Sequence, residues 1–161
     1  MEQISKLLAA LRPGQVAAIH CIDLDHFRAI NKHYGRAGGD QVLREIGTRL
    51  RGLLRGNDPV ARIGGDRFLV LQQDVKRPLD VARLANRIML EINRSVQLGS
   101  ELVSVSSSIG FALAPRDGTD ANQLFEKAET ALLSIKQRDR GTFDAGSAEW
   151  IGSSVPAMTE D

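Results

Sequence analysis

The stretch VARIGGDRFLVLQ, residues 60–72, decides the fold that this sequence predicts. Two short runs rich in apolar residues, 60–63 and 68–72, flank the pair Gly64-Gly65. Tight turns between paired strands need positive φ angles, which glycine adopts without steric cost. The stretch therefore predicts a β-hairpin that carries Asp66 at its tip or at the start of its second strand.

A strand and two helices are expected before the hairpin. Residues 16–22 are mostly apolar and are followed by acids, which indicates a buried strand. Apolar residues then recur at helical spacing from Phe27, so we expect a helix that ends at Gly35, followed by a glycine-bearing turn to Gly39. Asp40 is placed to cap the next helix, whose apolar stripe would face the core.

Two helices and one long strand are expected after the hairpin. Helical periodicity predicts a third helix over about 80–96. Apolar residues alternate over 102–113, which indicates one long half-buried strand, and Pro115 should end it. Asp120 is placed to cap a fourth helix that runs to about residue 137.

The order of these elements is β-α-α-β-β-α-β-α. Without one helix it becomes β-α-β-β-α-β, the ferredoxin-like pattern, in which an antiparallel sheet carries helices on one face. The predicted fold class is therefore α+β. We expect a single domain over residues 1–146, with its core at 16–143, and a tail or linker start at 147–161.

Composition excludes several classes of protein. The 161 residues are 42% hydrophobic and 25% charged, as is usual for a soluble globular domain, and the net charge of +1 gives no reason to expect nucleic-acid binding. No apolar run approaches the roughly 20 residues of a membrane span, and the N-terminus lacks the features of a secretory signal. The lone Cys21 is expected to be buried, and a cytoplasmic location is the default expectation.

Acidic residues gather at predicted strand ends. Asp23 and Asp25 follow the first strand, and they would meet Asp66 if that strand lies beside the hairpin. Clustered carboxylates repel one another unless a cation neutralises them, and Mg²⁺ held by one or two carboxylates and substrate phosphates would do so. Gly64 and Gly65 would let a bulky ligand approach the backbone. The simpler alternative is that the acids cap a helix and the glycines only form a turn.

Five segments of the chain recur in a known family. They are DLDHFRAIN at 23–31, Gly39-Asp40, RIGGDRF at 62–68, Ser108-Ile109-Gly110, and a diverged segment at 129–140. In order and spacing they resemble the motifs of the GGDEF domain family of diguanylate cyclases. The resemblance implies a nucleotide-cyclase-like variant of the predicted fold, with the GGDRF sequence on the hairpin.

The resemblance also implies a reaction and a site. In the family, two GTP molecules on two facing domains condense to cyclic di-GMP, and two pyrophosphates leave. The implied residues are Asp23 and Asp66 for Mg²⁺, Asn31 and Asp40 for guanine, and Phe27, Gly64, Gly65, Lys136 and Arg140 for the rest of the nucleotide.

Arg67 departs from the family pattern, which has glutamate at this position. The change replaces a negative charge by a positive one beside the expected dication, and arginine could pair bidentately with Asp23, Asp25 or Asp66. We expect Arg67 to act as a tethered counterion that weakens Mg²⁺ binding and impairs or abolishes catalysis. The alternative is that Arg67 points to solvent, because neighbouring side chains on a strand alternate in direction.

A second site is implied by RGND at residues 55–58. It matches the R-x-x-D inhibitory motif of the family, in which Arg55 and Asp58 would bind cyclic di-GMP, with Arg87 as a further contact. The simpler interpretation is a charged turn that ends a helix.

Three functions therefore compete. The first is a degenerate regulatory domain that binds cyclic di-GMP or GTP, and the second is a working cyclase that tolerates Arg67. The third is an interaction module that binds no nucleotide. The resemblance further suggests a homodimer, no direct membrane contact, and a longer parent protein with other signalling domains that could be membrane-anchored.

Overall fold

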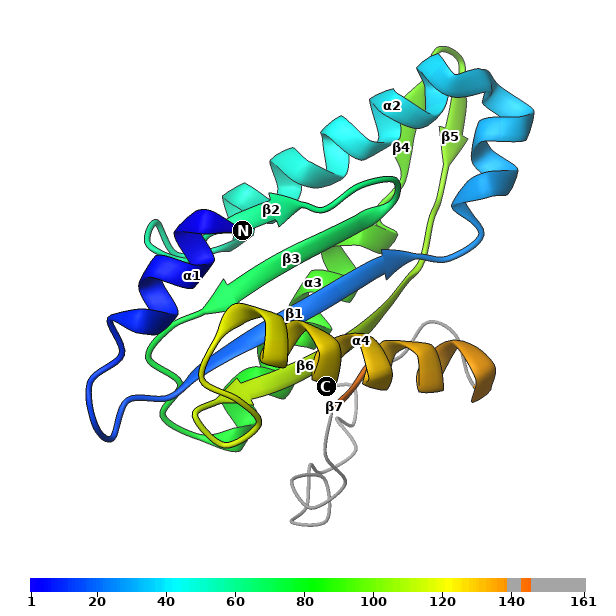
Figure 1. Ribbon diagram of the computed structural model, residues 1–161. Helices are drawn as coiled ribbons and strands as arrows, with labels where there is room; N and C mark the ends of the chain where they lie inside the picture. The colour runs from blue at the N-terminus through cyan, green and yellow to red at the C-terminus, as the bar shows by residue number, and fades with distance from the viewer. Residues whose placement is uncertain (139–142, 146–161) are drawn as a thin grey trace.

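The computed structural model describes residues 1–138 and 143–145 and contains an α+β fold (Figure 1). Its helices are α1 (Glu2–Ala9), α2 (Phe27–Leu53), α3 (Pro78–Asn93) and α4 (Ala121–Arg138). Its strands are β1 (Ala17–Leu24), β2 (Val60–Arg62), β3 (Arg67–Gln72), β4 (Val96–Leu98), β5 (Glu101–Val103), β6 (Ser107–Ala114) and β7 (Phe143–Ala145).

The main sheet has the strand order β2-β3-β1-β6-β7. Strand β1 lies at its centre and pairs antiparallel with both β3 and β6, while β7 pairs parallel with β6. The hairpin predicted from residues 60–72 is confirmed as β2 and β3. At its tip Gly64 and Gly65 have φ angles of 104° and 50°, and the Arg67 amide donates to the Gly64 carbonyl over 3.1 Å.

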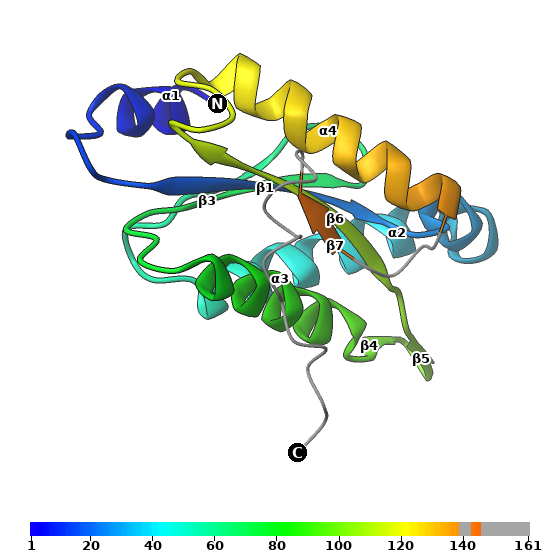
Figure 2. The same cartoon turned by 90° about the horizontal axis from the view of Figure 1, so that it is seen from below.

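Helices cover both faces of the sheet, as Figure 2 shows, so the expectation of helices on one face was wrong. Helices α2 and α3 pack on one face with Ile22 and Leu24 of β1. Helices α1 and α4 pack on the other face with Ile19 and Cys21. Because neighbouring side chains of a strand point to opposite faces, all eight residues of β1 are buried.

Helix α2 contains the break that its sequence predicts, at Gly35, where φ is 75° and ψ is 170°. The helix resumes at once, so residues 36–39 are helical rather than a turn. The prediction that Asp40 caps a new helix was therefore wrong. One glycine in a non-helical conformation is enough to bend the axis, and the following glycines are tolerated as helical residues at a modest cost in stability.

The long strand expected over residues 102–113 is divided in two. Strand β5 pairs with β4 in a separate hairpin, and β6 begins only at Ser107. Val96 lies in β4, beyond the end of α3. All of β6 is buried, whereas half-burial was expected, because α4 covers its second face.

Two helix starts show what local sequence predicts and what it does not. Asp120 caps α4 as expected, since its Oδ1 accepts from the Gln123 amide over 2.9 Å. Helix α1 was not predicted, although Ile4 and Leu8 lie one turn apart and are both buried.

Within the described residues no helix combines the length and apolar character that crossing a membrane requires. The predicted tail at 147–161 lies outside the described residues.

Candidate functional site

The acidic end of β1 lies between the hairpin and β6. Asp23 is in register with Arg67 of β3 on one side and with Ser108 of β6 on the other. The Leu24 amide donates to the Asp66 carbonyl over 3.2 Å, which holds the hairpin tip against the end of β1. The structure thus brings Asp23 and Asp66 together. Burial raises the pKa of Asp66, and the neighbouring Asp23 carboxylate raises it further.

Asp25 has a different environment from Asp23. Its carboxylate accepts hydrogen bonds from the hydroxyls of Ser106 and Ser108 over 2.7 and 2.8 Å, and its amide donates to the Ser106 carbonyl. Asp25 is only 3% exposed. These contacts fasten the segment after β1 to the start of β6, so Asp25 positions the acidic end.

Arg67 points towards α4 and forms ion pairs. Its Nη1 lies 2.5 Å from Glu129 Oε1, and its Nε lies 3.4 Å from Asp23 Oδ2. The alternative in which Arg67 points freely into solvent does not occur, since its side chain is 28% exposed. Burial by itself would lower the pKa of Arg67, but the bond to Glu129 and the charge of Asp23 raise it.

Lys136 completes this network from α4. Its Nζ lies 2.7 Å from the same Asp23 Oδ2 that faces Arg67. Glu129 and Lys136 are seven residues apart, and this spacing places them on one face of the helix. Sequence reasoning assigned no role to Glu129. Its position two turns before Lys136 could have placed Glu129 on the same face of the helix. Nothing in the neighbouring sequence, however, indicated that this face meets Arg67.

Gly110 explains how α4 comes so close to the sheet. A Cβ at this position would lie 2.1 Å from the Ala128 carbonyl oxygen and 2.6 Å from the Leu132 amide nitrogen. Only a residue without a side chain lets the helix backbone rest on β6 there. The Ser108-Ile109-Gly110 segment thus has two structural tasks, since Ser108 holds Asp25 and Gly110 admits α4.

The oxygens available for a divalent cation are few. Asp23 Oδ2 already faces two cations, whereas its buried Oδ1 has no hydrogen-bond partner among the described residues. No cluster of three or more metal-binding side chains occurs in residues 1–138. Asp23 Oδ1 and the Asp66 carboxylate would suit Mg²⁺, which often takes one or two carboxylates and phosphate oxygens. The residues thus fit the ion, with Arg67 competing for the same carboxylate.

A cleft of about 380 Å³ opens between α2 and the hairpin tip. Its lining brings together five predicted site residues, namely Phe27, Asn31, Asp40, Gly65 and Asp66. Gly39 leaves room for the Asn31 side chain, because a Cβ at residue 39 would lie only 1.8 Å from Asn31 Oδ1 and would clash with it. The cleft therefore presents an amide and a carboxylate at its α2 side and the acidic end at its other side.

Two of the predicted nucleotide contacts within the described residues do not line this cleft. Gly64 forms the turn, and Lys136 faces Asp23 from α4. Arg140 lies outside the described residues. At the start of α2, His26 has a left-handed conformation with φ of 56°, and the first amides of the helix follow it. Such free amides suit a phosphate, which is the role predicted for the amides around Phe27.

A separate cavity of about 200 Å³ lies at the far end of α2. Arg55, Asp58 and Arg87 all line it, and so does Arg83, which sequence reasoning missed. Asp58 Oδ1 accepts from the Gln73 amide over 3.0 Å, which fixes the carboxylate. Burial raises the pKa of Asp58, while the bonds from Gln73 and the charge of Arg55 oppose that shift.

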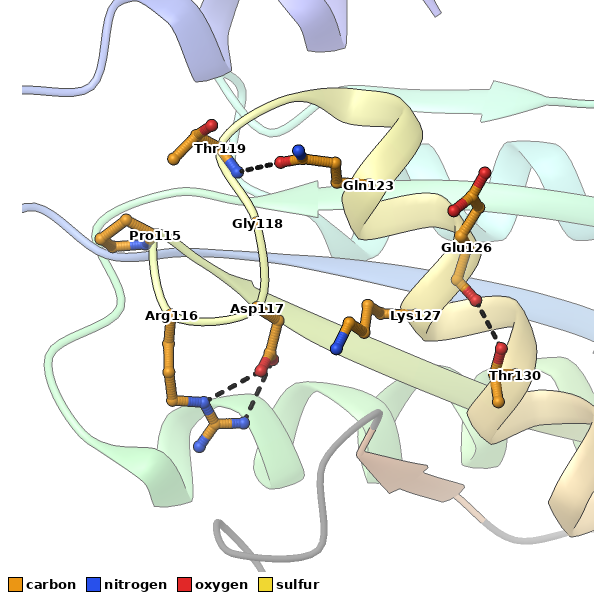
Figure 3. A pocket seen from close by; sticks show the side chains of 9 residues that line it. All are labelled: Pro115, Arg116, Asp117, Gly118, Thr119, Gln123, Glu126, Lys127 and Thr130. Carbon is orange, nitrogen blue, oxygen red and sulfur yellow. Dashed lines mark hydrogen bonds and ion pairs between the residues drawn. The ribbon is translucent and has the colours of Figure 1, made fainter.

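A larger cavity, of about 660 Å³, lies at the opposite end of β6 from Ser108 (Figure 3). Its wall is the loop Pro115–Thr119 with the first turns of α4, roughly 23 Å along the strand from the acidic end. Arg116 pairs with Asp117 over 3.1 Å, and Asp117 also accepts from the Leu113 amide. The Arg116–Asp117 pair braces the loop, so cavity size alone does not mark the site.

Known proteins are similar to this chain in sequence and in fold. The family described as "Diguanylate cyclase, GGDEF domain" matches residues 1–142. The bifunctional diguanylate cyclase/cyclic di-GMP phosphodiesterase MucR of Pseudomonas aeruginosa is 36% identical over 134 residues, which is 83% of this chain and 19% of MucR. The chain thus spans about a fifth of that relative.

Solved structures share the fold. The GGDEF domain of TpbB (YfiN) from Pseudomonas aeruginosa superimposes with a TM-score of 0.85 at 34% identity, covering 91% of this chain and 92% of that one. The GGDEF domain of DgcB from Caulobacter crescentus, solved in complex with c-di-GMP, gives 0.80 at 25% identity, covering 90% and 86%.

Proposed function

The chain belongs to the GGDEF domain family of cyclic di-GMP signalling, and from this premise we propose that it is a regulatory guanine-nucleotide-binding domain with impaired or absent cyclase turnover. The observation that carries the proposal is the pairing of Arg67 with Asp23 and Glu129. In this chain a guanidinium occupies the place of the family's glutamate.

A charge count supports the loss of turnover. Asp23, Asp66 and Glu129 contribute three negative charges, and Arg67 and Lys136 two positive ones, which leaves −1. With glutamate at residue 67 the same group would carry −3. A cluster at −3 needs a dication, whereas one at −1 is already largely neutralised. Two unit charges 4 Å apart interact by about 4 kcal/mol near a protein surface, so Arg67 opposes a nearby Mg²⁺ substantially.

The proposed contacts to the guanine base and to the phosphates come from groups that Arg67 does not touch. Asn31 and Asp40 would bind the guanine edge, since an amide and a carboxylate together offer donors and acceptors. The amides at the start of α2 and Lys136 would meet the phosphates. Mg²⁺, when bound at Asp23 and Asp66, would neutralise phosphate charge. We therefore propose that GTP binds, with a weakened dependence on the ion.

Turnover would require more than binding. In the family reaction the 3′-hydroxyl of one GTP attacks the α-phosphorus of the other, and pyrophosphate leaves, twice in succession. Negative charge develops on the phosphoryl oxygens and must be met by fixed positive groups. In this chain Arg67 forms ion pairs with Asp23 and Glu129, so its guanidinium is not directed at the phosphoryl oxygens.

A second proposed activity is binding of cyclic di-GMP at Arg55, Asp58 and Arg87. One observation favours it, namely that Arg87, distant in sequence from Arg55 and Asp58, lines the same cavity as they do, together with Arg83. Guanidinium groups bind phosphates and the guanine edge bidentately, and the Asp58 carboxylate can accept from guanine N–H groups. The DgcB domain was solved with this ligand, which makes it the natural probe.

The deciding experiment combines binding and turnover on the purified domain. We expect calorimetry with GTP to give saturable heat, and chromatography after incubation with GTP and Mg²⁺ to show no cyclic di-GMP. Turnover by the wild type that disappears in Asp66→Ala would contradict the proposal and establish a working cyclase. Absence of heat with both GTP and cyclic di-GMP would leave the interaction module as the function.

The cyclic di-GMP site has its own test. We expect the wild type to bind the ligand and Arg55→Ala to lose at least about tenfold in affinity, since a charged hydrogen bond contributes about 1.5–3 kcal/mol. Equal affinity in Arg55→Ala would place the ligand elsewhere. Homodimerisation, neighbouring signalling domains and the location of the parent protein remain proposals from the family, because the chain spans a small part of its relatives.

A further inference from the structure

The cleft lined by Asn31 and Asp40, called the guanine-side cleft below, has a groove beside it. We propose that this groove is a separate binding site for a small ligand that carries two or more phosphate groups. The groove has a volume of about 290 Å³ and lies between α2 and the hairpin. Its polar lining is made of Arg44, Thr48, Arg51 and Arg62. It adjoins the cleft of Asn31 and Asp40 because both share Leu43 and Arg62.

The three arginines of this groove have no carboxylate partner in the described part of the chain. Among the described residues, no carboxylate lines the groove or forms an ion pair with Arg44, Arg51 or Arg62. Elsewhere arginine is commonly paired, as Arg49 is with Glu45 and Arg77 with Asp80. Three guanidinium groups around one small space repel one another, and an anion between them would remove that cost.

Two of these arginines are held in place by the protein. The Arg62 Nε donates to the Gly65 carbonyl over 3.0 Å, and the Arg51 Nη2 donates to Thr48 Oγ1 over 3.4 Å. These bonds use only part of the five donors of each guanidinium. The remaining donors, with Arg44, suit phosphate oxygens, for which the guanidinium fork has matching geometry.

Gly47 supplies an independent reason to expect a ligand. This glycine is buried in the middle of α2, where alanine would be the better helix former. The protein itself leaves room for a methyl group, because a Cβ at residue 47 would lie 3.5 Å from Arg51 Nη1 and 3.7 Å from the Phe68 ring, both ordinary contacts. Since Gly47 lines the groove, that space is left for a molecule that approaches the helix backbone.

The test is a titration of the domain with pyrophosphate in EDTA, followed by amide NMR shifts. We expect saturable shifts at Gly47 and Thr48. The double variant Arg44→Gln, Arg51→Gln should weaken that affinity at least tenfold. Its matched control, Lys32→Gln with Lys76→Gln, removes two exposed charges that do not line the groove and should leave the affinity unchanged.

Two further variants keep the result unambiguous. Gly47→Ala should raise the melting temperature and yet weaken pyrophosphate binding several-fold, a combination that a folding defect does not produce. Asn31→Ala should reduce GTP binding without changing the pyrophosphate shifts at Gly47, which separates this site from the proposed function. Absence of shifts at Gly47 and Thr48 in the wild type, or equal affinity in the double arginine variant, would overturn the proposal.

Discussion

The guanine-side cleft and the charge network around Arg67 share the hairpin tip, yet they are built in opposite ways. In the cleft, the helix glycine Gly39 makes space, and the polar side chains Asn31 and Asp40 face an open volume of about 380 Å³. In the network, Arg67 and Lys136 close on Asp23, and the charges are compensated within the protein. The cleft thus keeps an open volume at the proposed base site, whereas the network neutralises most of the negative charge at the proposed Mg²⁺ site.

The network also depends on a helix that the cleft does not use. Glu129 and Lys136 come from α4, which packs on the opposite face of the sheet from α2 (Figure 2). Among the described residues, the cleft is lined by α2 and the hairpin alone. Changes to α4 should therefore affect the two regions unequally, and the predictions that follow use this difference, from the largest expected effect to the smallest.

The largest effect is expected from Gly110→Ala, which attacks the contact between β6 and α4. The added Cβ would lie 2.1 Å from the Ala128 carbonyl oxygen, so the helix must shift. We expect the free energy of unfolding in urea to fall by about 4 kcal/mol, at the upper end of overpacking effects. Gly52→Ala is the matched control, since a Cβ there meets no atom within 4 Å. A loss below about 1 kcal/mol would show that α4 is not tightly seated.

Acid should destabilise the domain through a residue that belongs to neither region. His20 is fully buried beside Gln72, and burial lowers its pKa from about 6.5 to about 4. The unfolded chain therefore binds a proton more readily than the folded one. Stability should be complete above pH 6.5 and should fall by about 3 kcal/mol as the pH drops to about 4.

Urea titrations at several pH values, on the wild type and on His20→Gln, measure this effect. In His20→Gln the decline between pH 6.5 and 4 should largely disappear, because the glutamine cannot take up a proton. An unchanged slope in that variant would show that protonation of His20 does not cause the acid sensitivity.

Asn31→Ala tests the cleft directly. We expect GTP binding to weaken by about 10- to 50-fold, because a hydrogen-bond partner of the base would be lost, at about 1.4–2.3 kcal/mol. Arg67→Gln should change GTP affinity less than about threefold in EDTA. Calorimetry on both variants measures the contrast, and a larger loss in Arg67→Gln would show that the network, and not the cleft, holds the nucleotide.

Arg67→Glu should make the network depend on Mg²⁺. The new carboxylate would face Asp23 and Glu129, so the unfolding free energy in EDTA should drop by about 1–2 kcal/mol, reduced by partial solvent exposure. Millimolar Mg²⁺ should restore at least half of this loss, while the wild type should respond little. Thermal melts with and without Mg²⁺ measure it, and Arg67→Gln, which adds no acid, is the control. Equal Mg²⁺ responses in all three proteins would refute the counterion role of Arg67.

Local patterns predicted much of the fold because they depend on neighbouring residues. The diglycine turn, the break at Gly35 and the cap at Asp120 each follow from the backbone preferences of a few adjacent residues. The meeting of Asp23 with Asp66 was also expected, given a strand beside the hairpin. Their roles towards a metal or a nucleotide stay predictions.

Other features could not be read locally. Alternation over residues 102–113 favoured one half-exposed strand, but the second layer of helices buries β6 on both faces, and the bonds of Ser106 and Ser108 to Asp25 tie down the start of β6. Glu129 as the partner of Arg67 and Arg83 beside Arg55 were missed for the same reason. The residues of each pair are far apart in the chain. Whether they face each other depends on how whole helices and strands pack.

The sequence by itself determined the family, the hairpin with its GGDRF tip, and the positive charge at residue 67, since motif order and turn chemistry are written in neighbouring residues. Only the tertiary structure decided where that charge goes. Packing of α4 on Gly110 brings Glu129 and Lys136 to the end of β1, and electrostatic attraction then closes Arg67 and Lys136 onto Asp23. A charge has a position in the sequence, but its energy depends on which opposite charges the fold places within a few ångströms.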